Sequence, residues 1–228
     1  VWIVILITFV FQAVSYEFQD KAGNILGKNT FRIFLTLNGC LAPLLIGTAV
    51  GTFFTGSQFL VNKNAVADVA APVISRWCNE WHGLEAVGNL FNVGFGLMVM
   101  LLAICLGALY MINNIAHQTL TQQLRRRLGQ CFTLFVPILL IELIALFTMD
   151  GFAVDEAGIV SMQAGKYLYN LLQMPVVAAM FTIGAILLLL GILLTLLKKQ
   201  FNKGIWLAAP GTVLVVISLF LIAGYNNT

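Results

Sequence analysis

The chain has 228 residues, of which 60% are hydrophobic and only 9% are charged. Soluble domains have about a quarter of their residues charged, so this composition cannot form a water-soluble shell. The net charge of +3 is too small and too scattered for a surface that binds nucleic acid. These values predict an integral membrane protein and exclude nucleic acid as a partner.

Six apolar runs are long enough to predict transmembrane helices. A bilayer core about 30 Å thick requires about 20 apolar residues in a helix, and peptide groups in hydrocarbon must form their hydrogen bonds within that helix. We expect an all-α, polytopic membrane helical bundle that forms a single transmembrane domain over residues 1–228. Because Val1 lies inside an apolar run and Thr228 directly follows another, we expect this domain to be truncated at both ends. The six predicted helices cover about 1–15, 33–55, 86–112, 130–149, 176–197 and 205–225.

The positions of lysine and arginine predict the orientation, because positively charged loops stay cytoplasmic. Three lysines and arginines fall in the second and fourth connections, namely Lys63, Arg76 and Lys166. Nine fall in the first, third and fifth, namely Lys21, Lys28, Arg32, Arg125, Arg126, Arg127, Lys198, Lys199 and Lys203. The sequence therefore predicts a cytoplasmic Arg125–Arg127 loop, with Val1 and Thr228 on the periplasmic side.

Glu142 is the one ionisable residue well inside a predicted span. An acidic side chain at mid-membrane costs about 2.5–3.5 kcal/mol on insertion scales, and such residues usually face the bundle interior. Two interpretations stay open: a proton-relay carboxyl group, or a protonated side chain that hydrogen-bonds a neighbouring helix. Glu17, Glu85 and Asp150, at the ends of spans, join it as candidate proton-path or buried polar residues.

Uncharged polar residues also occur within the predicted spans. Asn89 and Asn92 are three residues apart, so we expect both on one helical face. For these two and for Asn38, interhelical hydrogen bonding is favoured over the lining of a cavity or cofactor site. Gly47 and Gly51 form a small-xxx-small pair, which favours close helix packing within the subunit over a contact between subunits.

The sequence offers no catalytic or metal-binding motif. His82 and His117 fall in loops predicted to face opposite sides, so they do not form paired transmembrane ligands for a haem. Motifs for nucleotide binding and for a hydrolytic nucleophile are missing from the sequence. We therefore expect no catalytic residue and no haem or metal ligand in this chain.

Five segments resemble one known family, the cytochrome bd ubiquinol oxidase subunit II family. In order along the chain they are Phe11–Gln19 (FQAVSYEFQ), Gly47–Gly56 (GTAVGTFFTG), Trp81–Ala86 (WHGLEA), Met149–Val154 (MDGFAV) and Ala223–Thr228 (AGYNNT). The resemblance covers essentially the whole chain. The family often has arginine at the positions of Gln12 and Gln19, so no role of those basic groups is carried over here.

The resemblance implies a quinol oxidase that reduces oxygen to water and builds a proton gradient with protons taken from the cytoplasm. The family has about nine spans, and this chain corresponds to the third through the eighth. Haem b, haem d and the quinol-oxidising loop belong to the partner, subunit I, so we expect no cofactor bound by this chain. The implied surroundings are the bacterial inner membrane, subunit I, lipid and quinone, and the resemblance allows for a small accessory membrane subunit.

The chain is then expected to be subunit II, which scaffolds the haem-bearing subunit and is a candidate to line a proton or oxygen path. The rival from another class is a secondary transporter with Glu142 as its coupling carboxylate. A third interpretation is a purely structural membrane subunit without a proton role.

Overall fold

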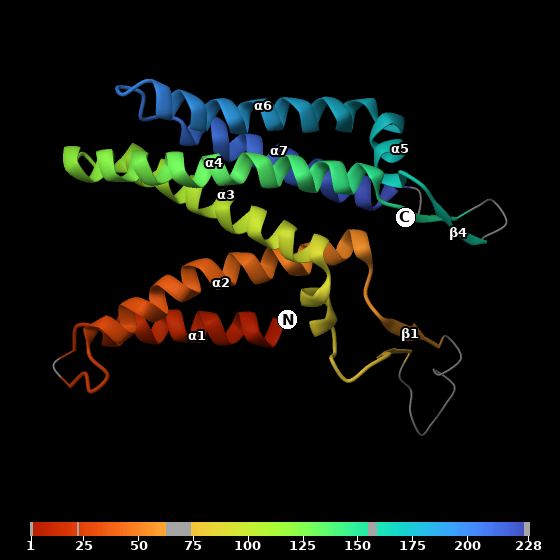
Figure 1. The fold of residues 1–228 in the computed structure, drawn as a ribbon, viewed down its shortest axis with the longest axis horizontal. Coiled ribbons are helices and arrows are strands. Elements are labelled where there is room, and N and C mark those ends of the chain that lie inside the picture. The colour runs from red at the N-terminus through yellow and green to blue at the C-terminus, as the bar shows by residue number, and fades with distance from the viewer. Residues whose placement is uncertain (1, 22, 63–73, 155–158, 226–228) are drawn as a thin grey trace. The chain divides into compact units, whose positions relative to one another are not determined.

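The computed structural model describes residues 2–21, 23–62, 74–154 and 159–225. Val1, Lys63 and Thr228, which enter the predicted orientation, lie outside these residues. Within the described ranges the chain forms seven α-helices, one 3-10 helix and two pairs of short strands (Figure 1). The α-helices are α1 (Trp2–Phe18), α2 (Lys28–Thr55), α3 (Leu90–Asn114), α4 (Gln118–Thr148), α5 (Lys166–Gln173), α6 (Pro175–Leu197) and α7 (Ile205–Ala223). The other elements are β1 (Phe59–Val61), β2 (Ser75–Trp77), the 3-10 helix η2 (Leu84–Gly88), β3 (Gly151–Val154) and β4 (Val160–Gln163).

The predicted all-α, polytopic fold is confirmed. In the part of the chain that the structure describes, five helices are long and apolar enough to cross a membrane, namely α2, α3, α4, α6 and α7. They contain 19 to 31 residues, which at 1.5 Å per residue gives lengths of about 28–46 Å. Helix α1 is a shorter apolar helix of 17 residues, so the sixth span stays a prediction.

The basic triplet Arg125–Arg127 lies on a helix, and the prediction of a loop there is wrong. Helix α4 begins at Gln118, twelve residues before the predicted start at residue 130. The His117 side chain caps this start by accepting a hydrogen bond from the Leu120 backbone N–H. Most residues between are glutamine, leucine and arginine, which are good helix formers, so the helix extends beyond its apolar part.

Two connections that were expected to be loops contain antiparallel β-hairpins. Strand β1 pairs with β2 so that Phe59 lies opposite Trp77. Strand β3 pairs with β4 so that Gly151 lies opposite Gln163, and the short helix α5 follows directly. These pairings satisfy backbone groups that would otherwise need water or side chains as partners.

The chain divides into two compact units, residues 1–97 and 98–228. In the first unit, α1 packs along α2 (Figure 1), with the Phe11 and Phe34 ring centroids 5.4 Å apart. Asn38 of α2 donates a hydrogen bond from Nδ2 to Oε1 of Gln12 on α1. This bond confirms the interhelical role that was predicted for Asn38.

Glycines let α2 approach the start of α3 closely. A Cβ built on Gly51 would lie 2.8 Å from Oδ1 of Asn92, and one built on Gly96 would lie 2.5 Å from the carbonyl oxygen of Leu44. Real Cβ atoms do not tolerate such distances, so only glycine fits at these two positions. The prediction that Gly51 packs within the subunit is confirmed.

In the second unit, α6 and α7 form the tightest helix pair. A Cβ on Gly211 would lie 2.6 Å from the carbonyl oxygen of Gly184, and one on Gly191 would lie 2.6 Å from that of Gly204. The two helices therefore touch backbone to backbone over about two turns. This pair supports the loop that forms one side of the pocket described next.

Candidate functional site

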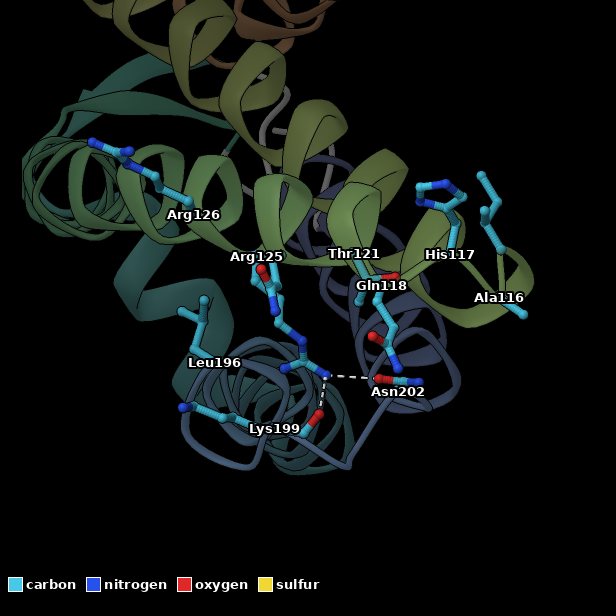
Figure 2. A pocket seen from close by; sticks show the side chains of 11 residues that line it. Ala116, His117, Gln118, Thr121, Arg125, Arg126, Leu196, Lys199 and Asn202 are labelled. Atoms are coloured by element: carbon cyan, nitrogen blue, oxygen red, sulfur yellow. Dashed lines mark hydrogen bonds between the residues drawn. The ribbon is translucent and has the colours of Figure 1, made fainter.

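A pocket of about 760 Å³ lies in the second unit, where α3 gives way to α4 beside the loop between α6 and α7. Figure 2 shows Arg125 reaching from α4 to this loop, with hydrogen bonds to Lys199 and Asn202. The lining residues are Ile115, Ala116, His117, Gln118, Thr121, Gln122, Arg125, Arg126, Leu196, Lys199 and Asn202. The lining thus combines cations and amides with a few apolar side chains.

The Arg125 guanidinium holds the connection between α6 and α7. Its Nη2 donates to the carbonyl oxygens of Lys199 and Phe201, each at 3.0 Å, and to Oδ1 of Asn202 at 2.7 Å. Its Nη1 donates to the carbonyl oxygen of Thr195, in the last turn of α6. A helix leaves its last carbonyl groups unpaired and carries partial negative charge there. Arg125 therefore caps α6 and fixes one wall of the pocket.

The other cations of the pocket have no carboxylate close by in the sequence. No Asp or Glu occurs in residues 86–141 or 157–228. Both ion pairs found among the described residues lie in the first unit. Arg126 and Lys199 line the pocket without an ion-pair partner in the described part of the chain. The pocket therefore has a positive potential that this unit does not compensate.

The two histidines have local structural roles. His117 is the N-cap of α4, with Nδ1 3.3 Å from the backbone nitrogen of Leu120 and 3.0 Å from Oγ1 of Thr119. His82 lies in an exposed turn with a positive φ of 47°, and its Nδ1 lies 2.5 Å from the carbonyl oxygen of Glu80. Both are exposed and lie outside the helices, as predicted, and the sides of the membrane that they face stay a prediction.

Glu142 is buried within α4, with 8% of the residue exposed. Its Oε2 atom is inaccessible to solvent and has no hydrogen-bond partner among the described residues. An unsatisfied buried polar atom costs free energy, so packing does not explain why a carboxyl group is kept at this position. The alternative, a hydrogen bond to a neighbouring helix, finds no support at Oε2.

Asn89 and Asn92 do not share a helical face, so that prediction is wrong. Asn89 precedes α3 in extended conformation, and its Oδ1 accepts a hydrogen bond from the backbone N–H of Phe91 at 3.0 Å. Asn92 is 2% exposed, donates to the carbonyl oxygen of Ala86 at 3.2 Å and accepts from Oγ1 of Thr55 at 2.9 Å. Since Thr55 ends α2, interhelical hydrogen bonding is confirmed for Asn92. The 3-10 helix η2 ends at Gly88, so α3 begins at Leu90 instead of the predicted residue 86 and leaves Asn89 just before the helix.

The other candidate carboxylates lie in separate places. Glu85, in η2, has both carboxyl oxygens buried without a hydrogen-bond partner in the described ranges. Glu17 is exposed and pairs with Lys21, whose hydrogen bond and charge hold the pKa of that carboxyl below its usual value. Asp150 is exposed, two residues beyond the end of α4. The structure thus sets Glu85 and Glu142 apart as buried carboxylates in different units, and the proton-path roles stay predictions.

The sequence analysis missed a group of buried polar residues at α5. Lys166 is 4% exposed, and its Nζ donates to Oε1 of Gln163 at 3.3 Å and lies 5.6 Å from the Tyr169 ring centroid. Asn170 is fully buried and donates to the carbonyl oxygen of Ile222 at 3.0 Å, which joins α5 to α7. The buried positions 166, 167, 170 and 171 follow helical spacing, which is the signal that could have found this face.

The model of the family described as cytochrome bd terminal oxidase subunit II matches residues 1–228. The chain belongs to this family. It is therefore a multi-pass membrane component of a respiratory oxidase, an oxidoreductase complex that contains haem. The match confirms the resemblance carried by the five segments and favours the oxidase subunit over the secondary transporter. A search of curated proteins found no match to the chain.

Neither histidine of this chain is placed between helices as an axial haem ligand would be. His82 and His117 stand in an exposed turn and at an exposed helix start, not within a helical bundle. Within the described ranges, no three His, Cys, Asp or Glu side chains gather in a group that could hold a metal ion. No step of the oxidase reaction is therefore assigned to a haem on this chain.

Proposed function

We propose that this chain is subunit II of a cytochrome bd-type quinol:oxygen oxidoreductase, that it scaffolds the haem-bearing subunit I, and that Glu142 lies on a proton route to it. The family match supports the oxidase assignment. The buried, unpaired Oε2 of Glu142 is the observation that carries the proton role. Haem b, haem d and the quinol site belong to subunit I in this proposal.

The scaffold role is supported by apolar side chains that the chain leaves uncovered. Helices α6 and α7 have mean hydropathies of 2.8 and 2.4 over their most apolar windows, yet only 28% and 22% of those windows are buried. On α1, Trp2 and Ile3 are 69% and 73% exposed. In a membrane such faces contact lipid tails or another apolar subunit, and both are compatible with a protein that surrounds a haem subunit.

The orientation is supported by the two ends of α4. Six cations gather near its start or in the α6–α7 loop beside it, namely Arg125, Arg126, Arg127, Lys198, Lys199 and Lys203. At the other end, Lys166 packs against Gly151, just beyond α4, and Asp150 is exposed. The positive-inside rule then places the pocket at the cytoplasm and Asp150 at the periplasm of the bacterial inner membrane.

A proton route through Glu142 follows from the chemistry of the complex. Reduction of oxygen to water consumes protons, and a buried carboxyl group can accept one and release it again because desolvation disfavours its charged form. Glu142 lies 17 residues after Arg125 on α4, or about 25 Å along the helix from the basic end. A proton taken up from the cytoplasm would meet this carboxyl group well inside the membrane.

Co-purification tests the assignment. An affinity tag on this chain, in cells that express the whole oxidase, should retrieve a larger partner and the long-wavelength optical band of haem d. The same preparation should consume oxygen when supplied with quinol. Isolation of the chain without any haem-containing partner, from membranes that show the haem d band, would contradict the proposal.

A further inference from the structure

The pocket at the basic end of the second unit has the chemistry of an anion site. Two of its cations, Arg126 and Lys199, have no ion-pair partner among the described residues, whereas Arg125 already bonds the loop carbonyls. The amides of Gln118, Gln122 and Asn202 line the same hollow and supply N–H donors. Arginine, lysine and amide donors together match the oxygens of a phosphate group.

The position of the pocket indicates which kind of molecule would supply the phosphate group. Its walls come from the link between α3 and α4, the start of α4, and the end of α6 with the loop that follows it. All three helices are long and apolar enough to cross a membrane. Two apolar side chains, Ile115 and Leu196, share the lining with the cations. A phospholipid at the membrane boundary has a phosphate group, which matches the cations, next to acyl chains, which match the apolar side chains. Basic pockets between transmembrane helices bind such headgroups.

We propose that this pocket binds the phosphate group of an anionic molecule, and that an anionic phospholipid of the surrounding membrane supplies it. Arg126 and Lys199 attract the charge, and the amides hold the phosphate oxygens. Arg125 positions the site by holding the α6–α7 loop in place. A bound headgroup would fasten α4 to this loop.

The test uses the purified, assembled oxidase in detergent, with lipid binding counted by native mass spectrometry during titration with phosphatidylglycerol. Each basic residue near a membrane surface strengthens the binding of an anionic lipid by about fivefold. The double variant Arg126→Gln/Lys199→Gln should therefore bind phosphatidylglycerol about thirtyfold more weakly. The matched control Arg127→Gln/Lys203→Gln removes the same charge from residues that do not line the pocket, and should bind like the wild type.

A second pair of variants adds one charge instead of removing two. Gln122→Glu places a carboxylate on the pocket wall, and Gln123→Glu places the same charge one residue further along α4, outside the lining. Only Gln122→Glu should weaken binding. Equal loss in both variants of either pair, or no loss in any, would overturn the proposal because the attraction would then be general surface charge or none.

A parallel titration with inorganic phosphate, read as a thermal shift, identifies the source. One outcome is a thermal shift with inorganic phosphate that is lost in the double variant, together with phosphatidylglycerol binding that the double variant leaves unchanged. That outcome supports the phosphate site and overturns the lipid as its source. Binding of phosphatidylglycerol but not of phosphatidylcholine, lost in the double variant, supports both parts. No response to either probe that depends on these residues overturns the site itself.

Discussion

Helix α4 carries two polar groups in opposite situations. Arg125, near its start, donates hydrogen bonds to the carbonyl oxygen of Thr195 in α6, to three carbonyl oxygens of the α6–α7 connection and to one side chain there. Glu142, further along the same helix, is buried with Oε2 unpaired among the described residues. A satisfied polar group stabilises the fold, whereas an unsatisfied one costs stability and is retained for another reason. The comparison predicts that removing Arg125 harms the structure and removing Glu142 harms the function.

The largest loss of stability is expected for Arg125→Gln. The glutamine is too short to reach the loop, so the last carbonyls of α6 lose their charged donor. We expect the free energy of unfolding of this unit to fall by roughly 3 kcal/mol, since hydrogen bonds to charged groups contribute about 1.5–3 kcal/mol each. Thermal unfolding of the assembled complex would show a lower midpoint.

The matched control for Arg125 is Arg127→Gln. Arg127 is exposed and its one hydrogen bond goes to Gln130 on the same helix, at 3.3 Å. Its loss should change stability by less than about 0.5 kcal/mol, as for most surface substitutions. Equal destabilisation by the two substitutions would show that Arg125 does not act as the cap of α6.

The next largest loss of stability is expected in the pair of α6 and α7, of which Arg125 caps the first helix. In Gly211→Ala the new Cβ would lie 2.6 Å from the Gly184 carbonyl oxygen, so α6 and α7 must separate. We expect a loss of about 1–3 kcal/mol from overpacking, again read from the unfolding midpoint. Gly107→Ala is the control, because a Cβ there meets nothing within 4 Å and alanine favours the helix.

A smaller effect is expected in the first unit for Thr55→Val. The substitution removes the hydroxyl that donates to Oδ1 of Asn92 at 2.9 Å and keeps the shape of the side chain. Interhelical hydrogen bonds in membranes contribute about 0.6 kcal/mol on average, so a loss of about 1 kcal/mol or less is expected. Thr182→Val should change less, because the Thr182 hydroxyl bonds only within its own helix. A larger loss at Thr182 would contradict this account of the α2–α3 contact.

The smallest effect on stability is expected for Glu142→Gln. The amide has nearly the same shape as the carboxyl group, and Oε2 forms no hydrogen bond to lose among the described residues. The free energy of unfolding should stay within about 0.5 kcal/mol of the wild-type value, or rise slightly because an ionisable group has left the interior. A large drop would show that Glu142 is structural, which would remove the contrast with Arg125.

The sequence predicted the membrane-spanning helices well because hydrocarbon imposes a length and an apolar composition on them. The same criterion could not predict the first part of α4, Gln118–Leu128, where most residues are polar, or the short helix α5. Glu142 could be found because a lone acid in an apolar run is conspicuous. The capping of α6 by Arg125 could not be predicted, because the partners of Arg125 lie 70 or more residues away and are backbone carbonyls, which carry no sequence signal. The start of α3 at Leu90, four residues later than predicted, could have been suspected from Gly88, because glycine disfavours a helix interior.

The proton role of Glu142 is tested most directly by proton uptake and oxygen consumption in the assembled oxidase with Glu142→Gln. The control is Asp150→Asn, which removes an exposed carboxylate beyond the end of the same helix. Both complexes should contain the full complement of haem. We predict about a hundredfold lower rate of proton-coupled oxygen reduction for Glu142→Gln, the lower end of the range for a lost proton-transfer group, and a much smaller change for Asp150→Asn. Wild-type turnover and proton uptake in Glu142→Gln would contradict the proton role and leave this chain as a structural subunit alone.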